Sequence, residues 1–157
     1  MADHHNRLVQ FILGTGTDHR NRTIEDILDM DDFWLEHIHD YIQWLFPIPE
    51  AGRFNQFAPV LDPATRDCFA ENPQLRQQQR RALDRMLRFL GLARNEALIT
   101  ATAELNPRDH IWLKAGGHNQ LRITRMIRSL HYCHQTELAI SLMVAVVGSN
   151  VGAIAPS

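Results

Sequence analysis

The stretch "HDYIQWLFP", residues 39–47, sets polar side chains among bulky apolar ones and stops at a proline. On a helical wheel for residues 32–46, the apolar side chains share one wide face: Trp34, Leu35, Ile38, Tyr41, Ile42, Leu45 and Phe46. Glu36, Asp40 and Gln43 lie on the opposite face. A face this wide is typical of a central helix with neighbours on more than one side. We therefore predict a single helix over this range, ended by the prolines that follow it.

Helix start and stop signals recur along the rest of the chain. Five positions have the residue types and spacing of N-caps: Thr23, Asp31, Asp62, Asn72 and Asn106. Gly91 stands where a C-terminal glycine cap belongs, after a long helix predicted over residues 73–90. Beyond a Gly-Gly pair, another long helix is expected to run to about His134. A last helix is expected over residues 136–148.

The chain shows no clean strand pattern and no Asn-Gly or Asp-Gly hairpin turn. The segment "ALITATAEL", residues 97–105, fits either a strand or a helix, and we assign it to a helix. At 157 residues, with 45% hydrophobic and 22% charged residues, the chain has the size and composition of one globular domain. We therefore predict an all-α fold, a compact single-domain bundle of about eight helices.

One long connection, residues 47–61, carries no regular pattern. Loops of this length in compact domains are usually either functional or disordered. Its apolar residues are Phe54, Phe57, Val60 and Leu61. Because disordered segments are poor in such side chains, we predict one long ordered loop that is pinned to the domain.

Charge is distributed unevenly between the two halves of the chain. Residues 1–71 hold 13 acidic residues and 5 arginines, whereas residues 72–157 hold 5 acidic residues, 10 arginines and Lys114. The net charge is only −2. We expect the two halves to attract each other within one fold, because a folded domain usually matches its own charges.

Two arginine stripes support an alternative. They lie on the polar faces of the two long helices and comprise Arg81, Arg85 and Arg88, and then Arg122, Arg125 and Arg128. Guanidinium groups pair with phosphate oxygens and stack on rings, so these stripes are candidates for anion or nucleic-acid binding. The competing interpretation pairs them with acidic residues of the first half. We favour this second interpretation and expect Arg122 and Arg125 to engage Asp40 or its acidic neighbours.

Catalytic and metal-binding motifs are weak. The histidines lack the spacing of a metal site, and the two cysteines have no motif, so no cofactor or metal is predicted. His39, Asp40 and His118 are the candidates for an acid–base set across two helices, with an unknown reaction. The commoner outcome for such a histidine is a hydrogen-bonded structural role.

Targeting and membrane signals are also weak. The N-terminal apolar run is too short for a secretory signal and has no basic block before it. The apolar run over residues 138–155 is interrupted by small polar residues and glycines, so it does not form a clean span. We expect no membrane span and a soluble, cytoplasmic protein.

Five stretches together resemble one known family, the conserved N-terminal domain of the opioid growth factor receptor family. They are "FILGTGTDHRNRTIEDIL" (residues 11–28), "HDYIQWLFP" (39–47), "FNQFAPVL" (54–61), "MLRFLGL" (86–92) and "HNQLRITRMIRSL" (118–130). Their order and spacing agree across about residues 8–130. The resemblance implies a domain over residues 1–148 with a flexible tail over residues 149–157.

What the family resemblance implies about function is a binding role. The vertebrate members are described as receptors for an enkephalin peptide that restrain cell growth, and the resemblance brings no catalytic residues with it. The motif matches that we take as candidate ligand-binding residues are His39, Asp40, Gln43, Trp44, Asn55, His118, Asn119, Arg122 and Arg125.

These residues also have an architectural interpretation. Asp40 paired with Arg122 or Arg125 would lock two helices in register, and Asn55 would tie the long loop down. Such a network is either purely structural or part of a ligand site. Our leading hypothesis is a non-enzymatic intracellular module that binds a peptide or protein near the loop over residues 47–61.

Overall fold

The computed structural model describes residues 6–51, 56–105, 110 and 117–154, and side chains only as far as residue 148. Within these residues it contains helices α1 (Arg7–Leu13), α2 (Ile24–Leu28), α3 (Asp32–His37), α4 (Ile42–Leu45), α5 (Pro63–Glu71), α6 (Pro73–Leu90), α7 (His118–Tyr132) and α8 (Thr136–Ile154), and strands β1 (Leu92–Asn95) and β2 (Leu98–Ala101). The prediction of a mainly helical chain is confirmed. The prediction of a purely α-helical fold is wrong, because residues 92–101 form a small antiparallel sheet.

Capping residues start the helices where the sequence places them. The Thr23 hydroxyl accepts the Asp26 backbone N–H at 3.1 Å, and the Asp26 carboxylate accepts the Thr23 N–H at 2.9 Å, which completes a capping box. Asp31, Asp62 and Asn72 cap α3, α5 and α6, each with a side-chain oxygen that accepts one backbone N–H. The expected helix start at Asn106 lies outside the described residues.

The predicted helix over residues 32–46 is interrupted. α3 ends at His37, Ile38 adopts an extended conformation, and α4 begins at Ile42. In a continuous helix the Leu35 and Ile38 carbonyls would accept N–H groups four residues later. Here they accept other donors: the Tyr41 hydroxyl donates to Leu35 at 2.5 Å, and Arg122 donates to both carbonyls at 2.7 Å. Tertiary hydrogen bonds have therefore replaced helical ones.

The segment assigned to a helix over residues 97–105 contains a strand instead. β1 and β2 pair with Asn95 opposite Leu98, so Glu96 and Ala97 form a two-residue turn. Glu96 has a φ of 56°, the left-handed conformation that such turns need and that glycine or asparagine adopts more easily. This is why the sequence carries no hairpin signal. Ile99 is buried, which fastens the hairpin to the helices.

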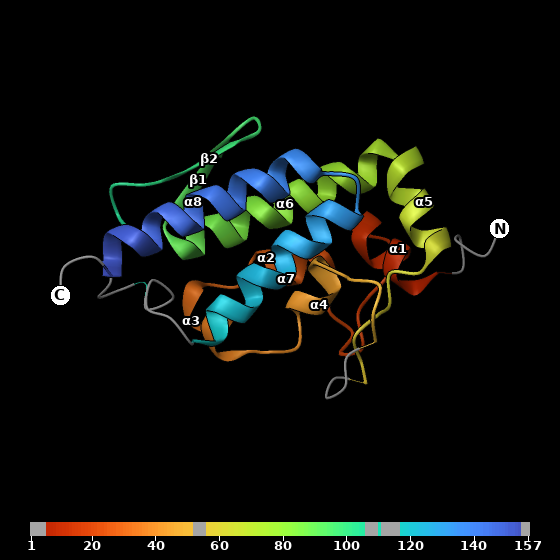
Figure 1. The fold of residues 1–157 in the computed structure, drawn as a ribbon. Coiled ribbons are helices and arrows are strands. Elements are labelled where there is room, and N and C mark those ends of the chain that lie inside the picture. The colour runs from red at the N-terminus through yellow and green to blue at the C-terminus, as the bar shows by residue number, and fades with distance from the viewer. Residues whose placement is uncertain (1–5, 52–55, 106–109, 111–116, 155–157) are drawn as a thin grey trace.

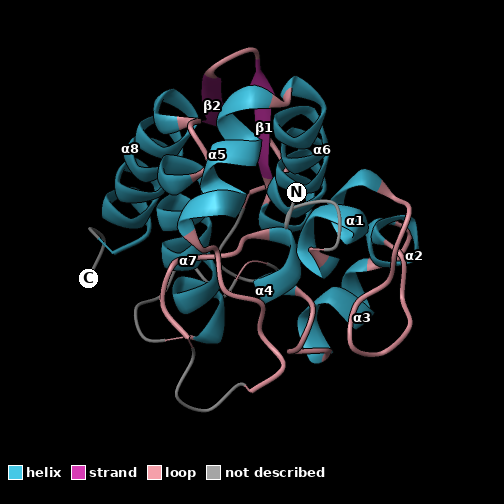
Figure 2. Cartoon of the chain, turned by 90° about the vertical axis from the view of Figure 1, so that its right-hand side faces the viewer, coloured by secondary structure: helices cyan, strands magenta, loops and turns pink. Residues whose placement is uncertain are grey.

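The core lies between α6 and the helices around it. α6 buries one apolar stripe: Leu75, Ala82, Leu83, Met86, Leu87 and Leu90. α7 and α8 run alongside each other next to α6 (Figure 1). α1 and α5 lie near the N-terminal end of α6 (Figure 1). The hairpin packs against α6 and α8 (Figure 2). Burial of each such side chain stabilises the fold by about 1.5–3 kcal/mol, which is why the wide apolar stripes dominate the architecture.

The described part of the long connection, residues 47–51 and 56–61, is attached at both ends. Ile48 and Val60 form an isolated parallel bridge, and the Leu61 N–H donates to the Ile48 carbonyl at 2.9 Å. The Phe57 ring stacks on His19, with ring centroids 5.1 Å apart. The prediction of a pinned connection agrees with these contacts.

Charge pairing between the two halves of the chain is confirmed. Arg81 pairs with Glu25 at 2.6 Å, Arg85 pairs with Asp32 at 2.9 Å, and the Arg128 Nη2 atom lies 2.5 Å from a Glu50 oxygen. Arg85 is buried rather than displayed on the surface. The two stripes therefore serve largely as intramolecular contacts and do not form a continuous cationic face.

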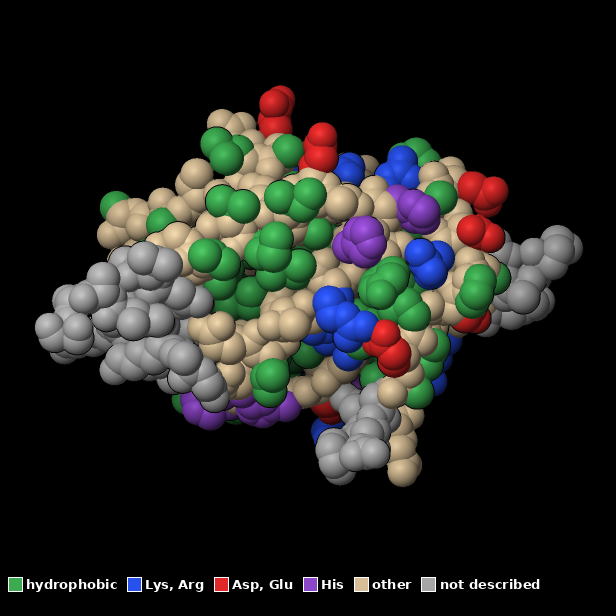
Figure 3. Space-filling view, in the orientation of Figure 1, with side chains coloured by type: hydrophobic (Ala, Val, Ile, Leu, Met, Phe, Trp, Pro, Cys, Tyr) green, Lys and Arg blue, Asp and Glu red, His purple; other side chains and the backbone are tan. Residues whose placement is uncertain are grey.

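α8 extends to Ile154, beyond the helix end expected near Gly148. Apolar side chains gather over α8 and the neighbouring part of α7 (Figure 3), and the exposed ones there are Leu121, Ile140, Met143, Val144 and Val147. Within the described residues, no helix combines the length and the apolar composition needed to cross a membrane.

Candidate binding groove

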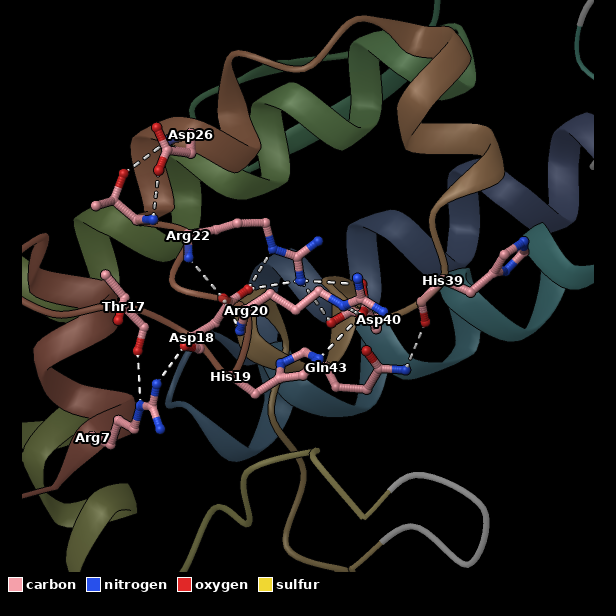
Figure 4. A network of polar contacts seen from close by, with 11 residues as sticks. Arg7, Thr17, Asp18, His19, Arg20, Arg22, Asp26, His39, Asp40 and Gln43 are labelled. Carbon is pink, nitrogen blue, oxygen red and sulfur yellow. Dashed lines mark hydrogen bonds and ion pairs between the residues drawn. The ribbon is translucent and has the colours of Figure 1, made fainter.

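The break between α3 and α4 sends consecutive side chains in opposite directions. Figure 4 shows His39 and Asp40 pointing away from each other, with Asp40 among the residues that follow α1. His39 instead approaches α7, where its ring centroid lies 5.0 Å from that of His118. The motif over residues 39–47 therefore contributes to two separate sites.

The first site, which we name the N-terminal network, comprises Asp18, His19, Arg20, Arg22 and Asp40. The Asp40 carboxylate lies 2.6 Å from the Arg20 Nε atom, 3.1 Å from the Arg22 Nη2 atom and 3.1 Å from the His19 Nε2 atom. Although burial raises the pKa of Asp40, the neighbouring arginines and hydrogen bonds outweigh burial and hold it below the ordinary value of an aspartate. The predicted pairing of Asp40 with the arginines of α7 is therefore wrong.

Asp18 is the centre of this network, and the sequence did not single it out. Its side chain is completely buried and accepts the Arg20 and Arg22 backbone N–H groups at 2.8 Å and 3.0 Å. The Arg22 guanidinium donates to it at 2.7 Å. The only sequence signal is an aspartate two and four residues before arginines, which is compatible with an aspartate turn.

Trp44 also lies on the side of the N-terminal network. It is buried, its ring meets Phe11 edge to face with centroids 5.3 Å apart, and it stacks on His19 at 6.0 Å. The Arg7 guanidinium lies 5.7 Å from the centre of its ring. These contacts give Trp44 the surroundings of a core residue.

The second site is a groove between the residues after α3 and one face of α7, and we call it the α7 groove. Its volume is about 360 Å³, and it is lined by His39, Ile42, Gln43, Ile48, His118, Leu121, Arg122, Thr124, Arg125 and Arg128. The structure therefore brings together five of the candidate residues along one groove: His39, Gln43, His118, Arg122 and Arg125. Asn55 lies outside the described residues.

One end of the groove is held by a polar cluster. His118 pairs with Glu36, and the Asn119 side-chain amide donates to Glu36 at 3.0 Å. Burial raises the pKa of Glu36, but these hydrogen bonds and the nearby cations outweigh burial and lower it. Burial and the charge of Arg122 lower the pKa of His39. The acid–base set of His39, Asp40 and His118 does not assemble, because Asp40 belongs to the N-terminal network.

Arg122 is fully engaged. It is buried, it donates to the Leu35 and Ile38 carbonyls, and it donates to the Asn119 side-chain oxygen at 3.1 Å. Its guanidinium lies 5.3 Å from the centre of the Tyr41 ring. Arg122 therefore acts as the external cap of the interrupted helix, with no acidic partner among these contacts.

Arg125, one turn further along α7, is placed differently. Its Nε atom donates to the Phe46 carbonyl at 2.8 Å, whereas its Nη2 atom is buried and has no partner within the described residues. Burial, aided by repulsion from Arg128 and opposed by attraction to Glu50, lowers the pKa of Arg125 to about 10. The expected ion pair between Arg125 and Asp40 is wrong, and Glu50, the acidic residue of the first half that acts on Arg125, forms its ion pair with Arg128.

Within the part of the chain that the structure describes, no group of three or more His, Cys, Asp or Glu side chains is placed to hold a metal ion.

The fold and the groove define a mostly helical domain with a small groove, of apolar and polar side chains, between a helix break and a long helix. This chain belongs to the family whose shared feature is the opioid growth factor receptor (OGFr) conserved region, since the model of that family matches residues 3–149. The resemblance noted in the sequence motifs is thereby confirmed. No solved structure matches the chain.

Individual relatives carry the same name. The chain is 39% identical to the mouse opioid growth factor receptor over 113 residues. This alignment covers 68% of the chain and 18% of the mouse receptor. The chain is 38% identical over 113 residues to the human receptor, covering 68% and 16%. Mouse opioid growth factor receptor-like protein 1 is 35% identical over 116 residues, covering 68% and 24%. The chain thus spans less than a quarter of the length of these relatives.

Proposed function

We propose that this chain is a non-enzymatic, cytoplasmic binding module that takes a peptide or protein segment in the α7 groove. The observation that supports it most is the convergence of two sequence motifs far apart in the chain, residues 39–47 and 118–130, on the two walls of one groove. Three relatives are named receptors or receptor-like, which favours binding over chemistry for the shared domain.

The composition of the groove suits a peptide. Ile42, Ile48 and Leu121 offer apolar surface, and histidine, glutamine and arginine side chains lie beside them. Peptide sites usually combine apolar pockets with a few polar groups that fix orientation. A volume of about 360 Å³ is sufficient for one or two anchoring side chains and is too small for a large ligand.

The state of the titratable groups argues against catalysis. His118 is paired with Glu36, and Asp40 is paired with two arginines and a histidine on the far side of the helix break. The acid–base set considered from the sequence therefore lacks its aspartate, and only His39 and His118 remain in the groove. The separation of these residues favours binding over catalysis.

A peptide-display selection tests this proposal. Random linear peptides would be selected on the folded wild-type chain and tested against Leu121→Glu, which places a charge in the groove at a side chain that is 75% exposed. Leu98→Glu is the matched control, because Leu98 is 63% exposed and lies on β2 outside the groove. Selected peptides should lose binding to Leu121→Glu only.

Two results would contradict the proposal. One is the absence of any enriched peptide with a sample whose folding is verified by circular dichroism. The other is a set of peptides that bind both glutamate variants as well as the wild type, since they would dock away from the groove.

A further inference from the structure

We infer that the α7 groove selects a ligand carboxylate that is flanked by an apolar side chain, with Arg125 as the group that receives the carboxylate. This inference rests on the proposed function and names the ligand chemistry of the same groove. The observation behind it is that the Arg125 Nη2 atom is buried and has no hydrogen-bond partner within the described residues.

Arg125 is a half-buried cation with one hydrogen bond to a backbone carbonyl. Other arginines with little exposure are compensated in one of two ways. Arg22, Arg85 and Arg94 have acidic partners, although Arg85 keeps two buried nitrogen atoms without a hydrogen bond. Arg122 has no acidic partner but donates to two backbone carbonyls and to Asn119. Desolvating a guanidinium without such compensation is costly. An anion brought by a ligand would remove this cost.

The acidic residues around the groove are already engaged. Both Glu50 oxygens accept the Arg128 Nη2 atom, at 2.5 Å and 2.6 Å, and Glu36 is held by His118 and Asn119. The groove therefore has an excess of positive charge that centres on Arg125.

The walls favour a carboxylate over a phosphate. Ile42, Ile48 and Leu121 line the same groove as the guanidinium. A phosphate carries close to two negative charges and needs several donors, whereas a carboxylate carries one charge, which a single guanidinium can balance. An apolar side chain next to the acid would occupy the remaining wall. Two sources supply this chemistry: the free C-terminus of a peptide that ends in an apolar residue, and an internal acidic residue next to one.

The test uses small probes and NMR chemical-shift titration of the folded chain. N-acetyl-leucine carries a C-terminal carboxylate, N-acetyl-Glu-Leu-amide carries an internal one, and N-acetyl-leucinamide is the neutral match. At least one acid should bind about 10-fold more tightly than the amide, a difference of about 1.4 kcal/mol in binding free energy. The dissociation constants come from the shifts of groove resonances. Comparing the two acids identifies the source.

Variants assign the effect to Arg125. Arg125→Gln should abolish the preference for acid over amide while leaving the weak amide shifts in place. Arg88→Gln is the control, because Arg88 is an exposed arginine on α6 away from the groove. Glu50→Gln should tighten acid binding, since it frees Arg128 and removes a competing carboxylate.

The inference is overturned if acid and amide bind equally, if Arg125→Gln keeps the preference, or if neither acid binds up to its solubility limit. Tighter binding of inorganic phosphate than of both acids would also overturn it and would favour an anion site of another kind. These results are separate from the peptide selection. Selected peptides that depend on Leu121 but bind equally as acids and amides would leave the proposed function standing without this ligand chemistry.

Discussion

The N-terminal network and the α7 groove lie on opposite sides of one helix break and differ in how completely their charges are paired. In the network, Asp18 accepts three donors and Asp40 contacts two arginines and a histidine. In the groove, Arg122 donates to three acceptors but Arg125 makes a single hydrogen bond. Both carboxylates of the network thus have cationic partners, whereas the Arg125 guanidinium has no ion-pair partner within the described residues.

One sequence motif supplies side chains to two different places in the fold. Residues 39–47 contribute Asp40 and Trp44 to the side of the N-terminal network, and His39 and Gln43 to the α7 groove. A motif match alone does not separate these roles. Mutations on the two sides should therefore behave differently, and the following four predictions are ordered from the largest expected effect to the smallest.

Asp18→Ala should have the largest effect on stability. It removes a fully buried carboxylate and leaves the Arg22 guanidinium and two backbone N–H groups without their acceptor. Stranding a buried partner in this manner costs about 3–5 kcal/mol. The urea midpoint should fall accordingly, with Asp67→Ala on α5 as an exposed control. A loss no larger than that of the control would mean that the network is not architectural.

Arg122→Ala should destabilise the fold by about 2–4 kcal/mol, because it leaves two carbonyls at the helix break without a donor. Arg122→Lys should recover only part of this loss, since an ammonium cannot reach two separate carbonyls as a planar guanidinium does. Both values come from urea unfolding at neutral pH. Full recovery by lysine would show that charge alone matters at this position.

Asp40→Asn should change the pH dependence of stability. The pKa of Asp40 is held below the ordinary value of an aspartate, so its ionised form stabilises the fold fully above the pKa that it has in the unfolded chain. This contribution is lost as the pH falls through the lower folded-state pKa. The wild type should therefore lose about 1 kcal/mol more than the variant between about pH 5 and about pH 2. Parallel acid limbs for the two proteins would contradict the assignment of these ion pairs.

Arg125→Ala should have the smallest effect, a change in the free energy of unfolding below about 1 kcal/mol. The variant gives up one hydrogen bond to the Phe46 carbonyl and also removes a desolvated cation, and these terms oppose each other. Urea unfolding of Arg125→Ala and of Arg122→Ala under the same conditions compares the two losses of unfolding free energy directly. A loss of about 3 kcal/mol would indicate that Arg125 has an acidic partner, like the arginines of the N-terminal network.

The sequence by itself determined what depends on neighbours in the chain. The caps at Thr23, Asp31, Asp62 and Asn72 were predictable, because each needs only a side-chain acceptor two or three residues before its donor. The mainly helical class followed from the same signals and from the 3.6-residue spacing of apolar side chains. The family was recognisable from motifs whose order is a property of the chain.

Only the tertiary structure decided which partner each polar group would take. The break after α3 depends on Arg122, which lies far along the chain and takes the carbonyls that a continuous helix would have used. The hairpin depends on the burial of Ile99, which offsets the conformational free energy that the left-handed backbone at Glu96 costs. Asp40 forms its ion pairs with Arg20 and Arg22, so it is not a partner of Arg125. These outcomes follow from three-dimensional proximity, which spacing along the sequence does not encode.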